Sequence, residues 1–143
     1  MKLSSPDFEN NALMPAKFSC LGQGVNPALI IDNLPKEAKS LALIVDDPDA
    51  LLKTYVHWVV YDIPVMTRIE EDSIPGTQGV NSSGDIYYVS PCPPTGTHRY
   101  FFKIYALDKM LSLDDGASKA ELEKAMQGHI LDRAELIGLY KKK

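Results

Sequence analysis

Hydrophobic residues along the chain gather in short runs with the length and composition of β-strands. The continuous apolar run at 41–46 predicts a central strand that is covered on both faces. Residues 56–63 and 98–107, which are rich in aromatic and β-branched side chains, predict two further strands. Shorter strands are expected at 16–20, 28–31 and 86–89.

One helix is predicted, close to the C-terminus. Ser118 is followed three residues later by Glu121, the spacing of a capping box, and good helix formers continue to Gly128, where the helix should end. Residues 129–140 fit either a helical stripe or the alternation of a strand. Because strands dominate, the sequence predicts a mainly β protein, a sandwich with a peripheral helix, folded as one domain over residues 1–143.

Charge and composition narrow the classes of function. The net charge of −4 argues against a general surface for nucleic acid or anionic membranes. No apolar run is long enough for export or for a bilayer span, so the expected location is the cytoplasm. The basic tail at 141–143 is expected to be a solvated end and no stable membrane anchor. Cys20 and Cys92 are expected to be reduced, mostly buried thiols.

Three polar groups stand at the ends of predicted strands: Asp47, His57 and His98. If the first two strands are antiparallel neighbours, Asp47 and His57 meet at one edge. His98 joins them only if its strand runs parallel to the strand of His57.

Alternation along each strand predicts which side chains share a face. On 98–107, His98 and Tyr100 should share one face, and Arg99 and Phe101 the other. On 56–63, His57 should lie with Val59 and Tyr61, opposite Trp58, Val60 and Asp62.

Such a trio supports three kinds of chemistry. Imidazole N–H groups and a tyrosine hydroxyl can bind an anion, two histidines and a carboxylate can bind a metal, and a histidine beside a carboxylate can transfer protons. Each residue also has a structural explanation: Asp47 as a capped turn, and His57 as a core histidine, while His129 is expected to be structural. The sequence contains no glycine-rich phosphate loop, zinc-spaced cysteine set or serine nucleophile elbow, so no cofactor is expected.

The order and spacing of several motifs resemble the phosphatidylethanolamine-binding protein family, and more narrowly its bacterial Raf-kinase-inhibitor-like branch. The motifs are Asp47-Pro48-Asp49-Ala50, His57-Trp58, and Pro91-Cys92-Pro93-Pro94-x-Gly96-x-His98-Arg99-Tyr100. Ser5-Pro6-x-Phe8, Pro15-Ala16-x-Phe18-x-Cys20, Lys119-Ala120-Glu121-Leu122 and Gly128-His129-Ile130-Leu131 extend the likeness over nearly the whole chain. Two positions depart from the family pattern: Leu51 replaces a usual proline, and Ile31 replaces a common aromatic residue.

The resemblance implies a sandwich of two antiparallel sheets, with residues 133–140 as a strand and a small anion pocket at one end. The residues that it assigns to ligand binding are Asp47, His57, Cys92, Pro94, His98 and Tyr100. It implies a binding protein for phosphate, a carboxylate or a phospholipid head group, which regulates a partner protein. The alternatives are an inhibitor of a kinase or protease, or a hydrolase that uses His57 and His98 as acid and base.

Overall fold

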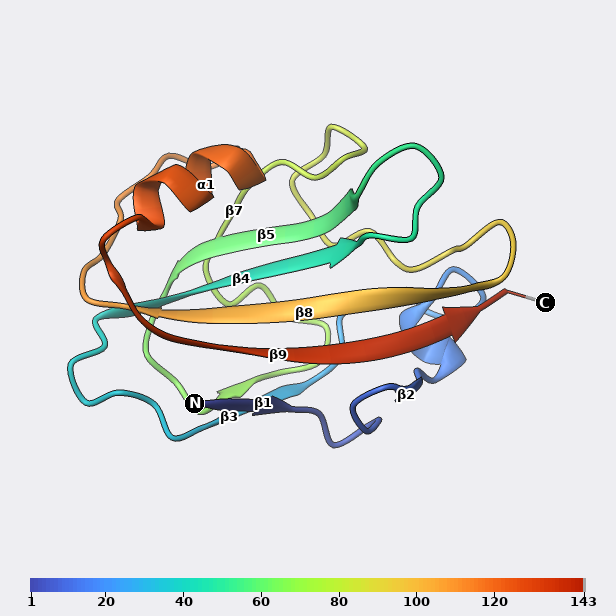
Figure 1. Ribbon diagram of the computed structural model, residues 1–143, viewed down its shortest axis with the longest axis horizontal. Helices are drawn as coiled ribbons and strands as arrows, with labels where there is room; N and C mark the ends of the chain where they lie inside the picture. The colour runs from blue at the N-terminus through green and yellow to red at the C-terminus, as the bar shows by residue number, and fades with distance from the viewer. Residues whose placement is uncertain (143) are drawn as a thin grey trace.

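The computed structural model describes residues 1–142, so of the basic tail only Lys143 lies outside the described residues. Two sheets face each other, as Figure 1 shows from the side. The larger sheet has the order β2-β9-β8-β4-β5-β7, formed by β2 (Ala12–Leu13), β9 (Ile130–Lys141), β8 (Thr97–Leu107), β4 (Ser40–Asp47), β5 (Tyr55–Ile63) and β7 (Thr77–Gln78). The smaller sheet has the order β1-β3-β6, formed by β1 (Lys2–Ser4), β3 (Leu29–Asp32) and β6 (Arg68–Ile69).

Strand β4 lies inside the larger sheet and is buried along its whole length. Its odd-numbered apolar residues, such as Leu43, face the smaller sheet and join the main core. Its even-numbered residues, such as Ile44, face the opposite side and join a second core beneath the helix. Burial on both faces explains why 41–46 is a continuous apolar run, and it confirms the predicted central strand.

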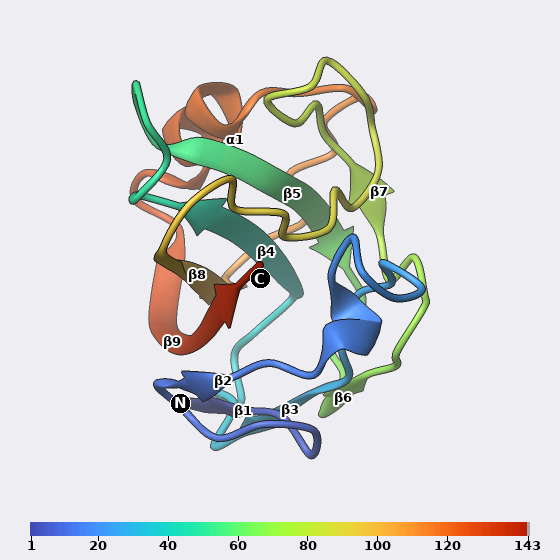
Figure 2. The same ribbon diagram turned by 90° about the vertical axis from the view of Figure 1, so that its right-hand side faces the viewer.

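The helix α1 (Lys119–Met126) covers the face of the larger sheet that points away from β1-β3-β6 (Figures 1 and 2). The capping box is confirmed: the Glu121 backbone N–H donates to Ser118 Oγ, and the Ser118 backbone N–H donates to Glu121 Oε1. Leu122 and Met126 are buried against the second core. The predicted fold, a mainly β sandwich with a short helix, is therefore confirmed.

Two of the short predicted strands are wrong. Residues 16–20 contain the 3-10 helix η1 (Ala16–Phe18), and residues 86–89 form no strand. Side chains organise the second segment instead, because the buried Asn81 donates from Nδ2 to the Tyr87 carbonyl oxygen at 2.8 Å. The strand expected at 28–31 is confirmed as β3.

The last strand, β9, settles the ambiguous segment at 129–140 as a strand. It pairs with β8 in antiparallel register, so that Tyr100 faces Gly138. On its other edge β9 pairs with the short β2 in parallel, the one parallel pairing of the described strands. Gly138 permits this approach because a Cβ atom there would lie 2.5 Å from Met14 Sδ.

No helix among residues 1–142 combines the length and the apolar composition that crossing a bilayer requires.

Candidate functional site

The polar groups at the strand ends come together at one end of the larger sheet. Strand β4 pairs in antiparallel register with both of its neighbours, with Asp47 opposite Tyr55 of β5 and Asp46 opposite Phe101 of β8. β5 and β8 therefore run in the same direction, which is the condition that the sequence set for His98 to join His57. The chain that leads into β8 crosses in front of the ends of β4 and β5 (Figure 2).

A β-bulge aims His57 at this site. The register shifts between Val45, which faces Trp58, and Asp46, which faces Val56, so that His57 is the extra residue of β5. Strict alternation would have placed His57 with Val59, which lies in the core beneath the helix. Instead the His57 ring contacts the Tyr100 ring edge-on, with centroids 5.3 Å apart. The predicted face of His57 was therefore wrong, and the bulge is the physical reason.

Two hydrogen bonds hold Val89 against His57. The Val89 backbone N–H donates to the His57 carbonyl oxygen at 3.0 Å, and His57 Nδ1 lies 2.6 Å from the Val89 carbonyl oxygen. Because a carbonyl only accepts, Nδ1 carries the proton, and Nε2 is the ring nitrogen that remains for a ligand. His57 itself is buried.

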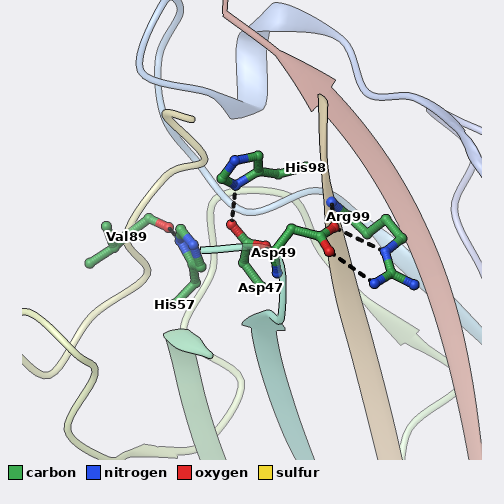
Figure 3. Close-up of polar contacts among 6 residues, drawn as sticks. All are labelled: Asp47, Asp49, His57, Val89, His98 and Arg99. Atoms are coloured by element: carbon green, nitrogen blue, oxygen red, sulfur yellow. Dashed lines mark hydrogen bonds and ion pairs between the residues drawn. The ribbon is translucent and has the colours of Figure 1, made fainter. Parts of the chain in front are cut away.

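His98 is fixed in the same way by a carboxylate. Its Nδ1 lies 2.7 Å from Asp47 Oδ2, while Asp47 Oδ1 accepts the Asp49 backbone N–H at 2.8 Å (Figure 3). The Asp47 side chain is only 4% exposed, so these two donors take the place of water around its carboxyl oxygens. His98 also stacks on Tyr100, with centroids 6.4 Å apart. As at His57, Nε2 is the nitrogen that remains for a ligand.

Asp49 and Arg99 brace the two chain segments from outside. Asp49 Oδ2 accepts the backbone N–H and the Nε–H of Arg99, and Oδ1 accepts Nη2–H, each at 2.9 Å (Figure 3). The guanidinium lowers the pKa of the Asp49 carboxyl below its ordinary value. Arg99 lies 5.4 Å above the Phe101 ring, so these two share the outer face as the sequence predicted.

A cavity of about 320 Å³ lies beside His57 and His98 at the end of the sandwich. All six residues that the sequence assigned to ligand binding line it: Asp47, His57, Cys92, Pro94, His98 and Tyr100. Sequence reasoning missed the other residues of the wall, Ala50, Leu51, Tyr55, Val89, Ser90 and Pro93. Of these, Tyr55 carried a signal, since it lies two residues before His57 at the start of the same strand.

Burial shapes the titration of the cavity groups. Desolvation lowers the pKa of the His57 imidazole below its ordinary value, although the Val89 carbonyl and the negative charge of Asp47 act in the opposite direction. Desolvation raises the pKa of the Tyr100 phenol, and the negative charge of Asp47 adds to that effect. Tyr100 therefore stays a neutral O–H group that can donate a hydrogen bond.

The two cysteines are not the reduced, buried thiols that the sequence predicted. Cys20 and Cys92 form a disulfide, their Cα atoms are 5.4 Å apart, and both residues are exposed. The segment after η1 packs beside the cavity wall, where the Cys20 backbone N–H donates to the Pro91 carbonyl oxygen at 3.0 Å. A separation of 72 residues along the chain hides this proximity from the sequence.

The metal alternative gains no support from the geometry. Within residues 1–142, no group of three or more histidine, cysteine, aspartate or glutamate side chains has an arrangement that could hold a metal ion. Both Nδ1 atoms are also engaged, by Val89 and Asp47.

Fold and cavity together define a β-sandwich protein with a ligand-sized pocket at the ends of its central strands. The sequence matches the phosphatidylethanolamine-binding protein family across residues 4–141, so the chain belongs to this family. A UPF0098 protein of Methanothermobacter thermautotrophicus is 45% identical over 150 residues, with 99% of each chain covered. A UPF0098 protein of Chlamydia trachomatis is 44% identical, again with 99% of each chain covered.

Two solved structures described as members or homologues of this family have the same fold. The crystal structure of a putative phosphatidylethanolamine-binding protein homologue from Chlamydia trachomatis superposes with a TM-score of 0.97 at 43% identity, covering 99% of this chain and 97% of that one. E. coli YbcL, described as a member of the mammalian family, superposes with a TM-score of 0.90 at 26% identity, covering 99% and 98%.

Proposed function

We propose that this protein binds a small anion, such as phosphate, a carboxylate or the phosphate of a phospholipid head group, in the cavity around His57 and His98. The observation that carries the proposal is the way in which the two imidazole rings are hydrogen-bonded. Each ring is fixed through Nδ1, by a carbonyl or a carboxylate, and each lines the same cavity with Nε2 left for a ligand. The family is one of binding proteins, which supports the same conclusion.

The chemistry of the lining favours an acceptor ligand. When an imidazole is protonated, its Nε2–H donates a charge-assisted hydrogen bond to an anionic oxygen. The Tyr100 ring packs beside both imidazoles and lines the same cavity, so its hydroxyl adds a neutral donor. Asp47 fixes the orientation of the His98 ring, because its carboxylate oxygen Oδ2 lies 2.7 Å from Nδ1.

Binding should therefore be linked to proton uptake. A neutral His57 has its proton on Nδ1, which faces Val89, so Nε2 must gain a proton before it can donate to an anion. Burial lowers the pKa of His57, so this proton is taken up only when the pH falls below the ordinary imidazole value of about 6.5 or when the anion arrives.

Isothermal titration calorimetry with sulfate tests the proposal. Sulfate keeps its charge throughout the range in which imidazoles titrate, so any pH dependence belongs to the protein. The affinity should rise as the pH is lowered, by up to about tenfold per pH unit for each proton taken up. Titrations in two buffers of different ionisation enthalpy should show that protons are taken up on binding. An affinity that does not change with pH, or no binding, would refute the role of the imidazoles.

The hydrolase alternative is weaker than the binding proposal. Among the described residues, the hydrogen bonds of His57 and His98 lead to a carbonyl and a carboxylate, and neither leads to a hydroxyl nucleophile. Regulation of a partner such as a kinase or protease stays a prediction, as do the Raf-kinase-inhibitor-like branch and the cytoplasmic location.

A further inference from the structure

We propose that the Cys20–Cys92 disulfide is a redox switch for the cavity: the oxidised protein holds the cavity wall in its binding position, and reduction releases the wall and lowers anion affinity. This inference rests on the proposed function. It begins from the position of Cys92, which both forms the disulfide and lines the cavity beside Pro93 and Pro94.

The wall next to Cys92 has few other attachments. Pro91 accepts a hydrogen bond from the Cys20 backbone N–H, and ladder pairing begins again at Thr97, opposite Lys141. Between them, no hydrogen bond of the described residues joins 92–96 to the rest of the protein. Prolines contribute to this, because they have no backbone N–H. Apart from the packing of the buried Pro93, the disulfide is the attachment that fixes this segment.

The other end of the disulfide belongs to a firmly held segment. Phe18 is 1% exposed and its carbonyl oxygen accepts the Tyr88 hydroxyl at 3.3 Å. Ser19 is also buried, and its Oγ donates to the Ala16 carbonyl oxygen at 2.8 Å and accepts the Leu21 backbone N–H at 3.1 Å. The disulfide therefore ties a weakly bonded wall to a fixed point on the sandwich.

Both cysteines are exposed, so a dithiol reductant can reach the bond. Its thiolate attacks one sulfur and forms a mixed disulfide, and the departing sulfur takes a proton. The second thiol of the reductant then displaces the protein sulfur. Two electrons pass to the protein, which gains the two thiols, and the reductant is oxidised to its own disulfide. In a reducing compartment, disulfides are usually transient and often sense redox state.

The expected fall in anion affinity comes from the entropy cost of ordering residues 92–96 when the ligand binds. In the reduced protein, residues 92–96 are free to move, and ligand binding must fix them again. Fixing the backbone of a single residue is equivalent to roughly a tenfold change in affinity. We therefore expect the affinity for sulfate to fall at least about tenfold on reduction, and to recover on reoxidation.

Sulfate calorimetry on the full chain, oxidised and after reduction by dithiothreitol, tests the switch. The variant Cys20→Ala is the matched control, since it removes the bond and keeps the cavity residue Cys92. It should bind sulfate as weakly as the reduced protein and should not respond to reductant. Amide hydrogen exchange at residue 20, whose backbone N–H donates to the Pro91 carbonyl oxygen, should become faster in both. Near-UV circular dichroism should show that the fold is kept.

Three outcomes of these experiments would overturn the redox switch. Equal sulfate affinity of the oxidised and reduced protein would overturn the switch and leave the binding proposal intact. Global unfolding of the reduced protein would assign the disulfide to stability alone and would also overturn the switch. If the oxidised protein does not bind sulfate, the proposed function fails, and the switch fails with it.

Discussion

The substitution His98→Asn separates the two hydrogen bonds of this histidine. The amide nitrogen of asparagine occupies roughly the position of Nδ1, so that it can still donate to Asp47 Oδ2, now 2.7 Å from Nδ1. Nothing replaces Nε2, the nitrogen that remains for the ligand. Because the Asp47 side chain is 4% exposed, keeping its partner avoids leaving a buried carboxylate with one donor fewer.

The expected loss of sulfate affinity in His98→Asn follows from the hydrogen bond that is removed. A hydrogen bond to a charged group contributes about 1.5–3 kcal/mol, so the loss of the Nε2 donor should weaken sulfate binding about 10- to 150-fold. The lost stacking on Tyr100, with centroids 6.4 Å apart, should cost about 0.5–1.5 kcal/mol of stability. For a chain of this length, that corresponds to a fall in Tm of a few degrees.

His129 provides the matched control, because its Nδ1 lies 2.8 Å from Asp108 Oδ1 and it does not line the cavity. Calorimetry should be done below the ordinary imidazole pKa of about 6.5, where the imidazoles can take up a proton. Under these conditions the variant His129→Asn should bind sulfate like the unmodified protein. An unchanged affinity in His98→Asn, or an equal loss in both variants, would refute the assignment of Nε2 to the ligand.

Three further predictions concern stability, measured by chemical denaturation. Burial lowers the pKa of His57, so below about pH 6.5 the unfolded chain binds more protons than the folded protein, and stability should rise with pH up to that value. His57→Asn should flatten this rise. An unchanged slope would show that His57 is not the group responsible. Ser118→Ala removes the cap from the Glu121 backbone N–H and should cost about 1 kcal/mol; a loss near zero would mean that the cap is unimportant. Gly138→Ala places a Cβ atom 2.5 Å from Met14 Sδ and should cost about 1–3 kcal/mol, whereas an unchanged midpoint would show that Met14 moves away freely.

The sequence predicted the parts of the fold that local pattern controls. The apolar run of β4 and the aromatic-rich β8 were clear because each matches a buried strand. The convergence of Asp47, His57 and His98 followed from where the strands end, once the directions of β5 and β8 agree. The helix followed from its capping box, which is a local signal.

The remaining features depend on contacts between distant segments. Alternation along β5 could not show the bulge at His57, which is a property of its pairing with β4. The Cys20–Cys92 bond needs η1 to pack against the chain before β8, and no local pattern records that packing. Val89 holds His57 through backbone groups, which leave no trace in residue type.

A crystal structure of the oxidised protein soaked with sulfate at low pH measures the central claim most directly. The proposal predicts sulfate density in the cavity, with oxygens within hydrogen-bond distance of Nε2 of both His57 and His98. An anion bound elsewhere, with both imidazole Nε2 atoms facing water, would contradict it.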